Sequence, residues 1–301
     1  MRLSEPGYSC SGQLLCQAAE LGYTSQLKYF LGSQASLDVN APFNGETPLQ
    51  LAAKNGHVQI AALLLGRGAD PDSRISEEGT KPILHAYMNG DTALVKLLLL
   101  RDKPADIRVS TVDGRTPLHF AAESGNIELV QMLIERLEIR EPENARMRIP
   151  DLNALEGKEM TPLMIASRHG HLNIVELLLA KGAAVDLTDN ENHTALYHAT
   201  YNRHQLVAEA ILGHASPVNA RDENGDTPLT LAALAAREET TLLLLQHGAD
   251  AADLDSGDKN GDTALILAVE KQEKNIVEKL LKLGADVEHR NNDRQTALIV
   301  S

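Results

Sequence analysis

Eleven histidines and two cysteines are the side chains of this 301-residue chain that could bind a transition metal. Zinc sites need such residues at short fixed spacings, for example His-Glu-x-x-His on one helix face or a Cys-x-x-Cys pair. Neither spacing occurs here. His119 stands fourth in the heptapeptide T-P-L-H-F-A-A, and His57 and His171 each follow a glycine. These regular positions favour structural roles for the histidines, and the sequence predicts no metal site.

The glycine-rich and nucleophile motifs of common enzymes are also missing. The chain contains no G-x-x-x-x-G-K-[ST], no G-x-G-x-x-G and no G-x-S-x-G. Residues 253–262, D-L-D-S-G-D-K-N-G-D, have the acidic composition of a calcium loop. In neither possible register do Gly and Glu fall at the sixth and twelfth positions that an EF-hand requires. We expect an acidic hairpin turn there, and neither catalysis nor a cofactor in this chain.

A recurring heptapeptide organises the whole sequence. It reads T-P-L-Q-L-A-A from residue 47, T-P-L-H-F-A-A from 116, T-P-L-M-I-A-S from 161 and T-P-L-T-L-A-A from 227. With weaker copies included, the motifs begin at residues 13, 47, 81, 116, 161, 194, 227, 263 and 296. Most intervals are close to 33 residues. A fixed period of this length is typical of repeat proteins, which grow by stacking units rather than by enlarging one core.

The period and the T-P-L-H-type motif together resemble the ankyrin repeat over nearly the whole chain. The resemblance implies an all-α solenoid of helix-turn-helix units joined by short β-hairpin-like turns. On this basis we expect residues 1–301 to form a single array of eight full repeats and a partial ninth. The family also implies that a protein partner binds the concave face, which the turn tips and the ends of the first helices form.

Each part of the repeat has a local physical cause. Thr before Pro suits a helix start, because its hydroxyl caps free N–H groups and Pro is tolerated in the first turn. A glycine such as Gly56 or Gly170 then ends the first helix. Some copies lack their usual glycine, which leaves the local backbone geometry of those repeats open. Glu159 and Asn192 replace it in the turn, and Arg203 and Ala236 replace it after the first helix.

Two features depart from a regular array. The interval from residue 116 to 161 is 45 residues long, and we place its surplus at about 138–150. That insertion is either a tolerated surface loop or a binding loop. The ninth copy stops inside its first helix, at Ser301. Because solenoids normally finish with a polar capping repeat, we expect the chain to be part of a longer array or multidomain protein.

Composition restricts the class of partner. The net charge is −14, from 28 Lys and Arg against 42 Asp and Glu. Such a chain repels nucleic-acid phosphates and anionic membranes, so we expect neither as a partner. Cys10 and Cys16 make no disulfide framework, and Cys16 lies in an apolar stretch typical of a small core residue. With no secretory signal or membrane-spanning run, we expect the chain in the cytoplasm or nucleus. We also expect it to be a monomer.

The resemblance also predicts which residues bind the partner. Among the turn tips and first-helix ends, the middle of the array combines cationic and aromatic side chains: Arg115, Lys158, Met160, Arg168, His169, His193 and Tyr201. Arg and Tyr are enriched among interface anchors. One interpretation is a binding surface for a protein or peptide with acidic groups, and the other is a solvated surface with accidental charge.

The sequence therefore predicts a non-catalytic scaffold that binds a protein or peptide partner on its concave face. The alternative is an ankyrin segment that regulates or targets a larger signalling or enzyme protein.

Overall fold

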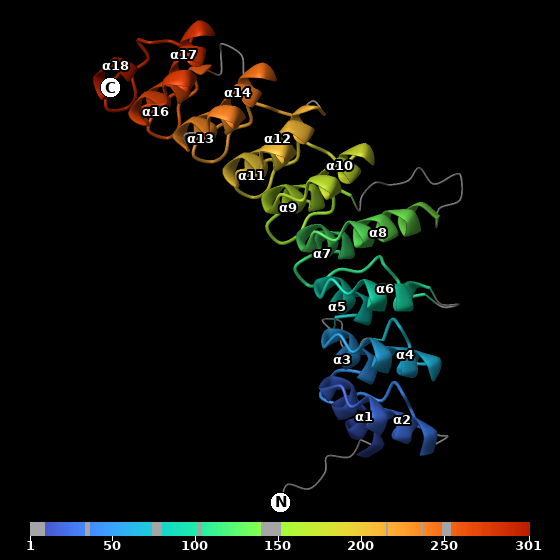
Figure 1. Ribbon diagram of the computed structural model, residues 1–301. Helices are drawn as coiled ribbons and strands as arrows, with labels where there is room; N and C mark the ends of the chain where they lie inside the picture. The colour runs from blue at the N-terminus through green and yellow to red at the C-terminus, as the bar shows by residue number, and fades with distance from the viewer. Residues whose placement is uncertain are drawn as a thin grey trace, which may run out of the picture. The chain divides into compact units, whose positions relative to one another are not determined.

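The computed structural model is helical throughout its described part and has no extended strands there (Figure 1). It describes residues 10–33, 37–73, 80–100, 104–139, 152–214, 216–235, 237–248 and 254–301. The chain divides into two compact units, Met1–Met147 and Arg148–Ser301, and each is described by itself. That all nine motif copies form one array stays a prediction.

The first unit contains four consecutive helix pairs. Its helices are α1 (Cys10–Leu21), α2 (Thr24–Ser33), α3 (Pro48–Lys54), α4 (Val58–Gly66), α5 (Pro82–Met88), α6 (Thr92–Leu99), α7 (Pro117–Ser124) and α8 (Ile127–Ile139). First helices pack on first helices, α1 on α3, α3 on α5 and α5 on α7, and second helices form a parallel row. The predicted insertion at about 138–150 overlaps the end of α8 and otherwise lies outside the described residues.

The second unit repeats this arrangement. Its helices are α9 (Pro162–His169), α10 (Leu172–Ala180), α11 (Ala195–Tyr201), α12 (Gln205–Leu212), α13 (Pro228–Leu234), α14 (Glu238–Gln246), α16 (Ala264–Glu270), α17 (Lys274–Lys282) and α18 (Ala297–Val300). The row of first helices runs α9, α11, α13, α16, α18, and the row of second helices runs α10, α12, α14, α17. The described helix pairs and the short turns between them confirm the fold class expected from the sequence.

The helix starts show why the motif is threonine followed by proline. In α3, the Thr47 hydroxyl accepts the backbone N–H of Gln50, and the Gln50 side chain accepts the Thr47 N–H at 2.8 Å. Thr161 and Thr227 cap α9 and α13 by accepting the N–H three residues on. These bonds satisfy N–H groups that a helix start leaves without an intrahelical partner.

Positions that lack the expected glycine nevertheless keep the glycine conformation. Glu159, Asn192 and Arg203 have φ values of 60°, 61° and 68°, in the left-handed region that Gly170 occupies with φ 75°. Their side chains therefore do not alter the repeat geometry, although a non-glycine residue in this region is strained. Ala236, the fourth departure, lies outside the described residues.

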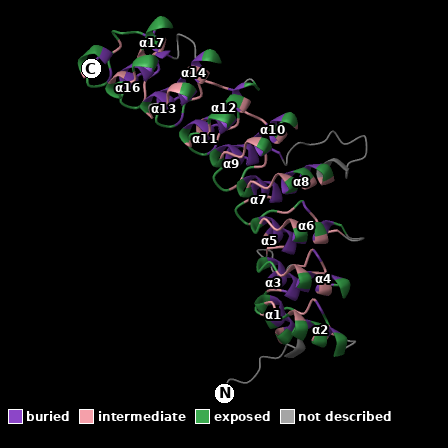
Figure 2. Ribbon diagram, viewed as in Figure 1, coloured by how far each residue is buried: buried purple, intermediate pink, exposed green. Residues whose placement is uncertain are grey.

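The core lies between successive helix pairs, as the buried residues in Figure 2 show. Small side chains on the first helices, such as Ala166 and Ala199, are fully buried and let neighbouring helices approach closely. Leu64 and Leu178 on second helices are likewise fully buried, and Cys16 is a buried core residue as expected. One repeat cannot bury these faces alone, so neighbouring repeats share the stabilisation.

Candidate functional site

Several exposed cationic and aromatic residues of the second unit lie on its turns and at the ends of its first helices. Arg168 and Tyr201 hold equivalent positions, each seven residues after the motif threonine, at the ends of the adjacent helices α9 and α11. Both side chains are exposed, Tyr201 to 60%. His169 is exposed beside Arg168 and stacks on His171. These residues form an accessible row at the helix ends.

Lys158 lies in the turn before α9 and is exposed. The backbone N–H of Lys158 donates to the Glu156 carboxylate at 3.1 Å. The carbonyl of Lys158 accepts the N–H of Asn190, in the next turn, at 3.1 Å. Successive turn tips are thus tied together by the backbone. Neither the Lys158 ammonium nor the Arg168 guanidinium forms an ion pair with any residue that the structure describes. Two cations are therefore available to a ligand here.

An aromatic ladder leads from the turn before α11 to its end. The rings of His193 and Tyr197 stack with centroids 3.8 Å apart, and Tyr197 stacks on Tyr201 at 6.0 Å with an interplanar angle of 6°. Tyr197 and Tyr201 are four residues apart on one face of α11, and His193 extends the ladder into the preceding turn. In a chain with 3% aromatic residues, this ladder is an unusual concentration of flat apolar surface.

Two of the predicted partner-binding residues lie in surroundings that the sequence did not predict. Met160 is buried, with 4% of its surface exposed, so its side chain contributes to packing and we leave it out of the candidate surface. Arg115 belongs to the first unit, where its guanidinium is paired with Glu123 and lies 4.3 Å from the centroid of the Phe120 ring. Its charge is largely compensated within its own repeat.

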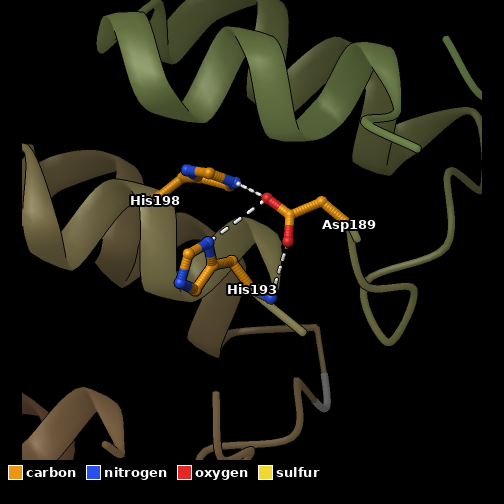
Figure 3. A group of neighbouring side chains, drawn as sticks. All are labelled: Asp189, His193 and His198. Atoms are coloured by element: carbon orange, nitrogen blue, oxygen red, sulfur yellow. Dashed lines mark hydrogen bonds and ion pairs between the residues drawn. The ribbon is translucent and has the colours of Figure 1, made fainter. Parts of the chain in front are cut away.

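His193, by contrast, is part of a buried cluster with Asp189 and His198, which Figure 3 shows. The Oδ2 atom of Asp189 lies 2.9 Å from Nε2 of His198 and 3.3 Å from Nδ1 of His193. The turn before α11 contributes Asp189 and His193, and α11 itself contributes His198. One carboxylate oxygen thus faces a ring nitrogen of each imidazole.

The backbone fixes the orientation of the Asp189 carboxylate. Its other oxygen, Oδ1, accepts the N–H groups of Glu191 at 3.0 Å and of His193 at 2.9 Å. Burial desolvates this carboxyl and favours its neutral form, but the hydrogen bonds from His198 and the two amides outweigh that effect and lower its pKa to about 2. Asp189 is therefore ionised at neutral pH, with Oδ2 directed at the two histidines.

A second carboxylate approaches His193 from the next repeat. Asp222 Oδ2 lies 3.6 Å from His193 Nε2, and its side chain is 1% exposed. Asp222 Oδ1 accepts the N–H groups of Asn224 and Asp226, whereas Oδ2 has no hydrogen-bond partner of normal geometry among the described residues. The pKa of Tyr197 is raised by burial and then by the charge of Asp222 and a hydrogen bond with this carboxylate. His193 is thus placed between two carboxylates from successive turns.

Sequence reasoning selected His193 but missed Asp189, His198 and Asp222. Asp189 and His193 are four residues apart and His193 and His198 are five apart, which matches no recognised metal motif. Asp189 and His193 lie in the turn, whereas His198 lies in the helix that follows. A signal was nevertheless present at His198. Four residues after the start of the motif, the other copies that begin with threonine carry apolar residues, whereas the weaker copies that begin at residues 13 and 81 carry Gln17 and His85. A buried histidine in a position that is apolar in most copies needs a polar partner.

Comparison with known proteins identifies the family. The family model described as ankyrin repeats (3 copies) matches residues 15–111, 62–143, 143–222 and 207–291. The chain belongs to the ankyrin repeat family. Repeats of this family generally mediate protein–protein interaction and are generally non-catalytic.

The curated relatives are longer proteins. The chain is 35% identical over 150 residues to the putative E3 ubiquitin-protein ligase XBAT31 of Arabidopsis thaliana, covering 46% of this chain and 30% of the relative. It is 31% identical over 147 residues to the human B-cell lymphoma 3 protein, covering 48% and 31%. It is 37% identical over 100 residues to the human transient receptor potential cation channel subfamily A member 1, covering 33% and 8%. The matches thus span less than a third of each relative.

Among the described residues, no helix has the length and apolar character needed to cross a membrane.

Proposed function

We propose that this chain is a protein-binding scaffold and that the second unit binds its partner through the turn tips and first-helix ends. The candidate surface consists of Lys158, Arg168, His169, His193 and Tyr201. The observation that carries the proposal is the aromatic ladder, which ends in Tyr201, a tyrosine that is 60% exposed. Its position is equivalent to that of Arg168, which forms no ion pair with any described residue. Rigid aromatic and arginine side chains are typical anchors of protein interfaces.

The charge of the surface indicates the chemistry of the partner. Lys158 and Arg168 have no ion-pair partner among the described residues, on a chain whose net charge is −14. His193 faces carboxylates of its own chain, so it is a poorer ligand for an external anion. We propose a peptide or loop that places an acidic group near Lys158 and Arg168 and an apolar side chain on Tyr201. Arg115 belongs to the first unit and is already paired with Glu123, so it is not part of this candidate surface and stays a separate prediction.

A double substitution tests the surface. The intact chain and a variant with Arg168→Ala and Tyr201→Ala are each used as bait in a cell lysate. For each protein that only the intact chain captures, the affinity for both forms of the chain is then measured. Removing two anchors should weaken binding by a few kcal/mol. The matched control replaces Glu270 and Lys271, exposed at the end of α16, by Ala and should bind normally. A loss below about 0.5 kcal/mol in the double variant would rule out these residues as anchors.

A second proposal is that the array regulates or targets a larger protein. It is favoured by the relatives, whose names include a putative ubiquitin ligase and a cation channel and of which the chain covers 30% and 8%. An antibody against the array, applied to an extract of the source cells, tests this idea. A band larger than the 301-residue chain supports it, and a band only at the size of this chain contradicts it.

A further inference from the structure

The cluster beneath the exposed surface has a composition that protein–protein binding does not require. Asp189, His193 and His198 each offer one ligand atom, and these atoms all lie within 4.8 Å of one another. Two imidazole nitrogens and one carboxylate oxygen are a common donor set for zinc. All three side chains are buried or nearly so, with 6%, 12% and 10% of their side-chain surfaces exposed.

Two of the three separations between the donor atoms fit a small cation with little adjustment. Zinc bonds of about 2.0–2.1 Å to nitrogen and oxygen place tetrahedral donors roughly 3.3 Å apart. His193 Nδ1 already lies 3.3 Å from Asp189 Oδ2. The pair of His198 Nε2 and Asp189 Oδ2 lies 2.9 Å apart and needs to open by only about 0.4 Å. The two imidazole nitrogens, which lie within 4.8 Å of each other, would also have to approach to a similar separation, and we propose that rotations of the side-chain torsion angles provide both changes.

The surroundings of the cluster match those of a metal-binding histidine. A histidine that binds metal through one ring nitrogen usually donates its other N–H to a carboxylate. If Nδ1 of His193 binds the ion, Nε2 carries the proton and faces Asp222 Oδ2 at 3.6 Å. This buried oxygen, which has no hydrogen-bond partner of normal geometry among the described residues, would then gain a donor. The two carboxylates also balance the charge of a divalent cation.

We propose that Asp189, His193 and His198 bind one Zn²⁺ ion, with Asp222 orienting His193 from the next repeat. A solvent molecule completes the coordination, because His193 retains some exposure. The ion would join the turn before α11 to the helix itself and, through His193 and Asp222, connect two repeats. This proposal shares only His193 with the candidate partner-binding surface. The variant with Arg168→Ala and Tyr201→Ala should bind Zn²⁺ normally, so the two ideas fail separately.

Zinc titration of the purified full chain tests the proposal. Binding is measured by competition with a chromophoric chelator, and thermal unfolding is followed with and without Zn²⁺. The wild type should bind one equivalent and unfold at a higher temperature when Zn²⁺ is present, because ligand bound to the native state stabilises it. Co²⁺ should give the visible absorption bands of a tetrahedral site.

The key variant is His198→Leu, because Leu231 and Leu267 stand at the same position in later repeats and the fold accepts them there. It should lower zinc affinity at least tenfold and abolish the thermal shift. Asp222→Asn, which keeps the acceptor for the turn amides, should lower affinity about ten- to hundredfold. His247→Gln, at an exposed histidine after α14, is the control for nonspecific binding and should leave the titration unchanged.

The proposal is overturned if the wild type binds no stoichiometric Zn²⁺. It is also overturned if His198→Leu binds Zn²⁺ as tightly as the wild type. Should circular dichroism show that His198→Leu is unfolded, His193→Gln replaces it with the same expected loss. Unchanged affinity in a folded His193→Gln variant would equally reject the site.

Discussion

Arg237 and Tyr201 connect two neighbouring repeats, since the guanidinium of Arg237, just before α14, donates to the Tyr201 carbonyl at 3.1 Å. The same guanidinium also donates to the carbonyl of Thr200. In other repeats a histidine at this position makes the equivalent contact. His57 bonds the carbonyl of Glu20 at 3.2 Å, and His204 bonds that of Arg168 at 3.1 Å. The residue before each of these second helices thus satisfies carbonyls at the end of the first helix of the preceding repeat.

Arg237→Ala should therefore destabilise the second unit. Removing the donor leaves two helix-end carbonyls without this partner, which should cost about 1–3 kcal/mol of unfolding free energy. Arg237→His, which installs the residue found at the equivalent positions 57, 171 and 204, should recover part of the loss. Urea unfolding followed by circular dichroism measures both. Equal stability of the alanine variant and the wild type would show that the contact contributes nothing.

Arg203→Gly should stabilise the chain. Arg203 is exposed and has φ 68°, a conformation that glycine adopts without steric strain. Relief of that strain should raise the unfolding free energy by about 0.5–1 kcal/mol, after allowance for the greater freedom of glycine in the unfolded chain. Asn192→Gly at φ 61° is the matched comparison and should change stability little, because Asn tolerates this region. A destabilised Arg203→Gly variant would contradict the strain argument.

Cys16 should react slowly with alkylating reagents while the protein is folded. The thiol is fully buried, and desolvation raises its pKa from 9.0 to about 11. Since the thiolate is the reactive form, both access and ionisation are suppressed at neutral pH. Iodoacetamide labelling of a Cys10→Ser variant, followed by mass spectrometry, isolates Cys16. Labelling should be fast in urea and slow without it, and similar rates would refute the prediction.

Asp226→Asn should stabilise the protein at neutral pH. Desolvation by burial, followed by the charges of Asp222 and Asp258, raises the pKa of Asp226. The folded chain thus binds this proton more tightly than the unfolded chain, so stability is lost as pH rises through the folded pKa. Uncharged Asn removes the loss, and because the site is partly exposed we expect a gain below about 1 kcal/mol.

The pH dependence distinguishes this cause from others. The advantage of Asp226→Asn should disappear as the pH falls well below about 4, because the aspartate then becomes protonated in both states. Unfolding in urea at pH 7 and below pH 4 measures it, with Asp293→Asn at an exposed position as the control for removal of one negative charge. An advantage that persists unchanged in acid would show that the charge is not its source.

The sequence alone determined the repeat and its local structure, because these depend on residues close together in the chain. Thr161 caps α9 from one residue away, Pro162 begins the helix and Gly170 follows its end. The Leu and Ala pattern then identifies the buried faces, since one period brings equivalent residues to equivalent positions. For the same reason, the partner-binding residues could be chosen only by their position in the motif.

Only the tertiary structure decided what surrounds each of those residues. Met160 is buried in the packed unit, although its motif position is equivalent to that of the paired Arg115. The cluster of Asp189, His193 and His198 forms because a turn folds back over the first turn of a helix, and Asp222 joins it because stacking places the next repeat alongside. Side-chain contacts between elements depend on how these elements pack, and a repeat pattern within one chain does not specify them residue by residue.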